Sequence, residues 1–183
     1  MRLSELFREV EFDGSIKNDA DINLVTDDSR LVRPGSLFVC IRHRSFDGHT
    51  AALDALASGA AAVVTQDRLG LENELRVADS RSAYARLCAA LCNHPERKLR
   101  MIGVTGTNGK TTVTTLIRNI LSDSGTKTLL TGTVCNRLGD ENLPSGLTTP
   151  KPPELYSLLS RAVSQGCKAL SLIHISEPTR HSL

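Results

Sequence analysis

The chain has 183 residues, a length that suits one large domain or two small ones. Hydrophobic residues make up 40% and charged residues 23%, as in an ordinary globular protein, and a net charge of +2 is too small to indicate a nucleic acid or an anionic membrane as partner. Aromatic residues make up only 3%, too few for a platform that stacks single-stranded bases, and no apolar run is long enough to span a bilayer.

The first half of the sequence alternates between helix and strand patterns. Apolar spacing predicts helices over 3–10, 50–58 and 80–93, and runs rich in β-branched residues predict strands over 22–25, 36–41, 60–65 and 75–77. Gly59 lies where the second helix needs a C-terminal cap, and His94-Pro95 ends the third. This alternation predicts a small α/β domain over residues 1–97, because the charged run 96–98 has the composition of a linker.

The most informative stretch follows. The apolar run 99–104 leads into Gly106-Thr107-Asn108-Gly109-Lys110-Thr111-Thr112, and a helical pattern comes next, with Val113, Leu116, Ile117, Ile120 and Leu121 on one face. A strand, a glycine-rich turn and a helix in this order are the context of a phosphate-binding loop. The spacing is a variant, because the general pattern has glycine five residues before Gly109, where this chain has Val104.

The residue types of this loop suit a nucleotide phosphate. Gly106 and Gly109 let the backbone come close to a ligand, while the free N–H groups and the dipole at the start of the helix attract negative charge. We expect Lys110 to reach the terminal phosphates and the hydroxyl of Thr111 to hold a magnesium ion. The alternative is a glycine turn before a helix whose lysine is merely solvated.

The remaining pattern predicts more of the same unit. We expect strands over 127–134 and 167–173, a polar loop over 136–147, and a helix from Pro153 with an inner stripe of Leu155, Leu158, Leu159, Ala162 and Val163. Together they predict a parallel sheet covered by helices. Only three strands of this sheet are present, so we expect a truncated domain.

Cysteine usage and the N-terminus indicate the compartment. The N-terminus has no signal-peptide pattern, which favours the cytoplasm. The five cysteines form no C-x-x-C pair, and no convincing further ligands accompany Cys88 and Cys92. Buried thiols are therefore the expected state of these residues, rather than a metal site.

The glycine loop, with its variant spacing, resembles the ATP loop of the Mur ligase family. Further similar segments are Asp28-Ser29-Arg30, Pro34-Gly35, Leu37-Phe38-Val39, Asp47-Gly48-His49, Gly59-Ala60 and Leu147-Thr148-Thr149-Pro150. The resemblance covers about residues 20–169 in the same order and at similar spacing, which is far more specific than one loop. The last segment is similar to the branch of the family that adds the third residue of the precursor peptide.

The resemblance implies an ATP-dependent ligase of peptidoglycan precursor synthesis, and thus of cell-wall biogenesis, cell shape and cell division. Its substrates would be UDP-MurNAc-L-Ala-D-Glu and either meso-diaminopimelate or L-lysine. The carboxylate of the UDP-substrate would attack the γ-phosphate of ATP to form an acyl phosphate, and the amine would then displace phosphate. Residues 1–97 would be the UDP-substrate domain and residues 98–169 the first part of a parallel-sheet ATP-binding domain.

The resemblance also implies residue roles. The loop from Gly106 to Thr112 would bind ATP, with Lys110 as the catalytic cation on the phosphates and Thr111 near Mg²⁺. Ser29, Arg30 and His43 would contact the UDP-sugar, although the family more often has glycine where His43 stands.

Thr148 and Thr149 would hold the substrate near the phosphate-transfer centre. Structural alternatives stay open for several of these residues. In these alternatives Arg30 only pairs with Asp27 or Asp28. Thr148 and Thr149 would only cap the next helix, and His49 would only make a structural hydrogen bond.

The resemblance ends at Ala169. The family continues there with a segment that carries Glu and His, whereas the run from Leu170 to Arg180 agrees with one reading frame of a transposase sequencing adapter. We therefore expect residues 170–183 to be a non-native tail, although their strand-like content favours pairing into the sheet. Without the missing segment and an amino-acid-selecting domain, we do not expect ligase activity from this polypeptide by itself.

Two other functions compete with this interpretation. Folylpolyglutamate synthetases have a similar ATP loop, but Asp28-Ser29-Arg30 and the extra N-terminal domain argue against them. The second is a non-catalytic nucleotide-sugar binding module. Which amino acid is added, and the oligomeric state, do not follow from the sequence.

Overall fold

The computed structural model describes residues 1–43, 45–132, 136–139, 141–143 and 150–173. For residues 171–173 it describes the backbone alone. The chain divides into two compact units, Met1–Asn93 and His94–Leu183. The sequence predicts the boundary between the two domains after residue 97, four residues further along the chain than the boundary between these units. Each unit contains parallel strands covered by helices, so the predicted α/β class is confirmed.

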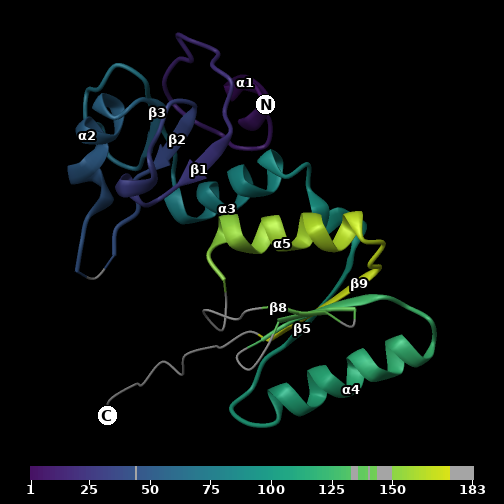
Figure 1. Ribbon diagram of the computed structural model, residues 1–183. Coiled ribbons are helices and arrows are strands. Elements are labelled where there is room, and N and C mark those ends of the chain that lie inside the picture. The colour runs from purple at the N-terminus through teal and green to yellow at the C-terminus, as the bar shows by residue number, and fades with distance from the viewer. Residues whose placement is uncertain (44, 133–135, 140, 144–149, 174–183) are drawn as a thin grey trace, which may run out of the picture. The chain divides into compact units, whose positions relative to one another are not determined.

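The first unit is a four-stranded parallel sheet. Its strands lie in the order β1 (Leu24–Thr26), β2 (Ser36–Val39), β3 (Ala60–Thr65) and β4 (Glu74–Arg76). The helix α2 (Ala52–Ala57) packs on β3, α3 (Ser80–Leu91) on β1, and the short α1 (Leu3–Leu6) on α3 (Figure 1). All the strands and helices predicted for this half are present, with ends that differ by a few residues; two 3₁₀ helices, η1 (Ser29–Leu31) and η2 (Gly48–Ala51), complete the unit.

Strand β2 lies at the centre of this core. Phe38 and Cys40 are fully buried and pack with Ala52 and Ala55 of α2. Because side chains alternate along a strand, Leu37 is buried at the opposite face of the sheet. The continuous apolar run 37–41 is therefore what a parallel sheet covered on both faces requires.

The second unit is a mixed sheet. Its strands lie in the order β5 (Arg100–Val104), β9 (Ala169–Ile173), β6 (Thr128–Thr131), β7 (Asn136–Leu138) and β8 (Glu141–Leu143). The first three run parallel, as predicted, whereas β7 and β8 add antiparallel pairs. Helix α4 (Lys110–Asp123) lies along one face and α5 (Pro152–Ser164) along the other (Figure 1).

The core of this unit lies under α5. Leu159 and Ala162 are buried against Leu129 of β6 and Leu170 of β9, and the other members of the predicted α5 stripe pack around them. Residues 169–173 form the strand between β5 and β6, so the strand-like content of this segment does lead to pairing into the sheet.

Three predictions for the second unit are wrong in detail. The predicted polar loop over 136–147 contains the β7–β8 hairpin. Its signal was the dipeptide Gly139-Asp140 between two short runs, and Gly139 takes a φ of +56°. The predicted linker 96–98 is part of a 3₁₀ helix, η3 (Pro95–Lys98), that packs against α5 and β5.

The third difference concerns the apolar face of α4. Val113, Leu116 and Ile120 are 44%, 55% and 66% exposed, while Thr114 and Arg118 are the buried residues of this helix. Burial of these polar groups is tolerated because the Thr114 hydroxyl donates to backbone carbonyl oxygens of its own helix, and the Arg118 guanidinium donates to the carbonyl oxygen of Gly139. Hydrophobic spacing alone therefore did not identify the buried face.

Two further expectations concern thiols and membranes. Cys40, Cys88 and Cys167 are buried, and burial raises the pKa of the Cys40 thiol to about 12, so this group stays protonated. Among the described residues, no helix has the length and apolar character needed to cross a bilayer.

We predict that Phe38→Ala lowers the free energy of unfolding of the first unit by about 3–5 kcal/mol, because the truncation leaves a cavity between β2 and α2. Urea titration of the whole chain, followed by circular dichroism, measures the change. Leu53→Ala is the matched control, since Leu53 lies on α2 but is 64% exposed. A loss no larger than that of the control would contradict the core position given to Phe38.

Candidate functional site

The glycine loop connects β5 to α4 in the arrangement that the sequence predicts. Gly109 is the N-cap residue of α4 with a φ of +77°, and Gly106 has a φ of +145°. A Cβ added at Gly109 would meet nothing within 4 Å, and one at Gly106 would meet only the Asn108 carbonyl oxygen at 3.7 Å. Glycine is thus required by the left-handed backbone rather than by lack of space.

Lys110 places a positive charge over this loop. It is the first residue of α4, and its ammonium group donates to the carbonyl oxygen of Gly106 and, at 3.4 Å, to that of Thr107. The loop residues Thr105–Gly109 are exposed, so the ammonium and the first N–H groups of a 14-residue helix converge at an accessible point. This donor set suits a phosphate group.

Thr111 and Thr112 follow in the first turn of α4, and both are exposed. Within the described part of the chain, no cluster of three or more His, Cys, Asp or Glu side chains could hold a metal ion. Magnesium beside nucleotide phosphates needs only one or two protein ligands, because phosphate oxygens and water supply the others. The hydroxyl of Thr111 therefore fits the predicted magnesium contact.

The first unit gathers its polar residues at one edge of the sheet. The four strands are parallel, so the segments that follow them all leave from the same, carboxyl-terminal edge. These segments are Asp27–Arg30 after β1, Arg42–Asp47 after β2, Gln66–Asp67 after β3 and Ala78–Ser80 after β4. Ligands of parallel sheets bind at this edge.

Ser29 and Arg30 belong to a small capped turn at this edge. Asp28 is the N-cap residue of η1, and its carboxylate accepts from the N–H of Arg30 at 3.0 Å. The Arg30 guanidinium returns to the same carboxylate at 2.9 and 2.6 Å but stays 86% exposed. The structural alternative for Arg30 is thus present as a pair with Asp28, and Ser29 begins the turn half-buried.

His43 lies at the same edge, after β2. Its backbone N–H donates to the carbonyl oxygen of Phe46 at 2.8 Å, and Arg42 and Asp47 form an antiparallel backbone bridge. The imidazole Nε2 lies 3.6 Å from Oδ2 of Asp27, and the His43 side chain is 41% exposed. The edge thus brings Ser29, Arg30 and His43 together.

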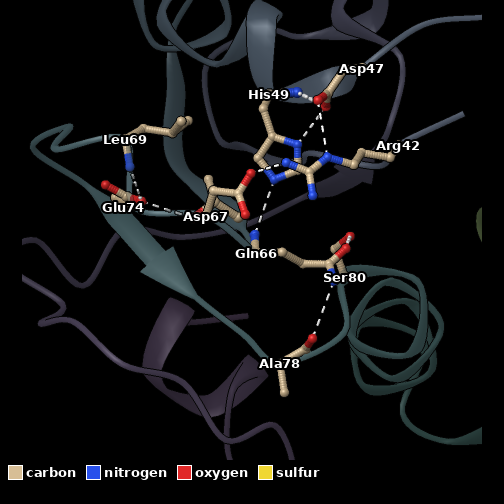
Figure 2. Close-up of polar contacts among 10 residues, drawn as sticks. Arg42, Asp47, His49, Gln66, Asp67, Leu69, Glu74, Ala78 and Ser80 are labelled. Carbon is tan, nitrogen blue, oxygen red and sulfur yellow. Dashed lines mark hydrogen bonds and ion pairs between the residues drawn. The ribbon is translucent and has the colours of Figure 1, made fainter.

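His49 has a structural role, the alternative that the sequence favoured. Its side chain is buried, with Nδ1 2.6 Å from Oδ1 of Asp47 (Figure 2). Nε2 accepts from the backbone N–H of Gln66 at 3.1 Å, which leaves the proton on Nδ1 for donation to Asp47. The imidazole therefore ties the end of β3 to the turn before α2, and its nitrogens are used inside the protein.

The same network continues through Arg42 and Gln66. Arg42 bridges the carboxylates of Asp47 and Asp67, and the Gln66 amide donates to the Ala78 carbonyl oxygen while it accepts from the Ser80 hydroxyl (Figure 2). The N–H of His49, its imidazole and Arg42 hold the pKa of Asp47 at about 2, so this carboxyl stays ionised.

A cavity of about 550 Å³ lies beside this network. Arg42, Gln66 and Phe12 contribute to its wall, together with the residues after β4. Its guanidinium groups are paired, Arg42 with Asp67 and Arg76 with Asp13. The wall also contains the carboxylate of Glu11, so the cavity offers no unpaired cation to a phosphate group.

Not every predicted residue can be placed. Thr148 and Thr149 lie outside the described residues, and the N-cap position of α5 belongs to Lys151. Conversely, the sequence pattern did not indicate that Asp27, Tyr84 and Gln66 contribute contacts at the carboxyl-terminal edge of the first sheet. Only the place of Asp27 directly after a strand was a usable signal.

Comparison with protein families gives two matches. Residues 21–94 match the Mur ligase family, catalytic domain, and residues 104–173 match the Mur ligase middle domain. The first match lies in the first unit, except for its last residue, His94, and the second match lies in the second unit.

Individual relatives are considerably longer than this chain. It is 36% identical over 173 residues to the UDP-N-acetylmuramoyl-L-alanyl-D-glutamate–2,6-diaminopimelate ligase of Phocaeicola vulgatus, an alignment that covers 92% of this chain and 36% of the relative. It is 37% identical over 193 residues to the UDP-N-acetylmuramyl-tripeptide synthetase of Deinococcus radiodurans, with 100% and 39% covered. The chain thus spans little more than a third of the length of these relatives.

Solved structures agree with these sequence matches. A structure of a UDP-N-acetylmuramoyl-L-alanyl-D-glutamate–2,6-diaminopimelate ligase aligns with a TM-score of 0.75 and 28% identity, covering 95% of this chain and 36% of that one. A MurF structure from Acinetobacter baumannii aligns with a TM-score of 0.60 and 21% identity, covering 94% and 35%, and shows the shared fold alone.

We predict that Asp47→Asn destabilises the chain at neutral pH and that this loss shrinks in acid. Because its folded-state pKa is depressed from 3.8 to about 2, Asp47 contributes stability above pH 4 that is lost as the pH falls through 2. Urea titrations between pH 3 and pH 7 measure the gap between variant and parent. Glu11→Gln, an exposed carboxylate of the same unit, is the control, and a gap that stays constant or widens in acid would contradict the network.

Proposed function

Because the chain belongs to the Mur ligase family, we propose that it is part of an ATP-dependent ligase that extends UDP-MurNAc-L-Ala-D-Glu by one amino acid in peptidoglycan precursor synthesis. Members of this family are ATP-dependent ligases. The observation that carries the proposal is the glycine loop between β5 and α4, with the Lys110 ammonium over it, in a chain that matches both family domains. The names of the relatives favour diaminopimelate as the amino acid, with L-lysine as the other candidate.

In this proposal the second unit binds ATP. The loop residues Gly106, Thr107, Asn108 and Gly109 and the start of α4 surround the phosphates with N–H donors, and Lys110 neutralises negative charge as it builds up during phosphoryl transfer. Thr111 contributes its hydroxyl to Mg²⁺ and Thr112 lies beside it. ATP activates the substrate carboxylate as an acyl phosphate, which the amine of the amino acid then attacks.

The first unit binds the UDP-sugar. The support is the placement of Ser29, Arg30 and His43 at one carboxyl-terminal edge, where the Arg30 guanidinium remains accessible to a pyrophosphate and the His43 ring is partly exposed. Thr148 and Thr149 are proposed to hold the substrate near the site of phosphoryl transfer. Because ATP and UDP-sugars are cytoplasmic nucleotides, we propose the cytoplasm as the compartment.

The domain limits also remain proposals. We assign the UDP-substrate domain to residues 1–97, the partial ATP-binding domain to residues 98–169 and a non-native tail to residues 170–183. The support for the tail is the agreement of Leu170–Arg180 with an adapter reading frame. Since β9 consists of residues 169–173, the strand between β5 and β6 is then largely formed by that tail.

We predict that Lys110→Ala weakens ATP binding to this chain by about 10- to 100-fold, because a hydrogen bond to a charged group contributes about 1.5–3 kcal/mol. Isothermal titration with MgATP measures the affinity. Lys168→Ala is the control, since Lys168 is an exposed lysine of the same unit that lies outside the loop. Equal affinity in Lys110→Ala and the control variant would remove Lys110 from the phosphate site.

We predict that Ser29→Trp weakens binding of UDP-MurNAc-L-Ala-D-Glu at least tenfold and leaves MgATP affinity unchanged. The indole would fill the space in front of η1 at the carboxyl-terminal edge of the first unit. Titration of the same preparation with both ligands separates the two effects. Parallel loss of both affinities would mean that the substitution unfolds the chain or that the sugar-nucleotide site is misplaced.

A further inference from the structure

Asp27 is an acidic residue that is almost fully enclosed at the carboxyl-terminal edge of the first unit. It directly follows β1, and its side chain is only 7% exposed. A buried carboxylate is costly unless other groups pair with it. Its two oxygens face different elements of the fold, Oδ1 the helix α3 and Oδ2 the loop after β2.

The contact from α3 is a hydrogen bond from Tyr84. This residue is 3% exposed, and its hydroxyl donates to Oδ1 of Asp27 at 3.2 Å. Burial, followed by the negative charge of Asp27, raises the pKa of the Tyr84 phenol, so the hydroxyl keeps its proton and remains a donor. A rigid helix residue thus fixes one side of the carboxylate.

The contact from the loop is His43. Its Nε2 lies 3.6 Å from Oδ2, on the side of the carboxylate that Tyr84 does not use. A carboxylate that faces Nε2 favours a proton on that nitrogen, which leaves the Nδ1 side of a 41% exposed ring for a ligand. The His43 ring is therefore in contact with Asp27 on its Nε2 side, while part of the ring stays accessible to solvent.

Two neighbouring carboxylates bind other side chains. Arg30 binds Asp28, and His49 binds Asp47. Asp27 reaches His43, and it stands next to the Asp28-Ser29-Arg30 segment.

We propose that Asp27 is a positioning residue for the UDP-substrate: with Tyr84 behind it, its carboxylate fixes the His43 imidazole at the carboxyl-terminal edge, where Nδ1 of the ring accepts from a hydroxyl of the UDP-sugar. This proposal rests on the proposed function of the first unit. It adds to that function the role of Asp27, which does not touch the ligand but orients His43, which does.

A double-mutant cycle tests this role. UDP-MurNAc-L-Ala-D-Glu is titrated calorimetrically into the whole chain and into its Asp27→Asn, His43→Ala and doubly substituted forms. Asp27→Asn is expected to weaken binding about fivefold when His43 is present and less than twofold in the His43→Ala background, because a residue that acts through His43 has no effect without it. Asp54→Asn, at an exposed position on α2, is expected to bind like the parent.

The remaining outcomes separate the two proposals. Equal weakening by Asp27→Asn in both backgrounds overturns the positioning role and leaves the UDP-substrate site in place. No binding by the parent chain overturns the site itself, and the positioning role with it. If Asp27→Asn melts at a clearly lower temperature than the parent, the same cycle with Tyr84→Phe replaces it; dependence on His43 supports the role, and independence overturns it.

Discussion

The common direction of the parallel strands is the constraint on which the candidate sites depend. Four parallel strands in the first unit send four successive segments to one edge of the sheet, although these segments are separated by helices along the chain. In the second unit β5 delivers the glycine loop from its carboxyl-terminal end into the start of α4. Strand direction thus brings together side chains that the sequence keeps far apart.

Two motifs of the first unit use the same local device. In Asp28-Ser29-Arg30 and in Asp47-Gly48-His49, the aspartate caps a 3₁₀ helix by accepting from the N–H two residues later. In both, the side chain of that later residue also returns to the carboxylate. The two motifs differ in burial. Arg30 remains exposed, whereas the His49 side chain is buried and accepts a hydrogen bond from the N–H of Gln66, which directly follows β3. Similar spacing therefore supports a ligand contact in one motif and a structural tie in the other.

The two faces of the second sheet are covered to different extents. Under α5 the apolar stripe is packed against β6 and β9, as its spacing indicates. On α4 the residues Val113, Leu116 and Ile120 are exposed, and the buried residues are the polar Thr114 and Arg118. The helix that follows the glycine loop is thus held by hydrogen bonds, such as that from Arg118 to the carbonyl oxygen of Gly139, as well as by packing.

The sequence by itself determined the α/β class, nearly all strands and helices, the glycine loop with Lys110 at the start of α4, and the family. These features depend on short-range patterns, because apolar periodicity, a left-handed glycine and a helix start involve residues that are close along the chain. It missed the β7–β8 hairpin, whose strands are too short for a clear alternation, and the exposed face of α4. Only the tertiary structure decided that Arg30 pairs with Asp28, that His49 is enclosed and that Asp27 lies between Tyr84 and His43. Asp27 and Tyr84 are 57 residues apart, and which side chains meet over such a separation depends on strand order and helix packing rather than on any local pattern.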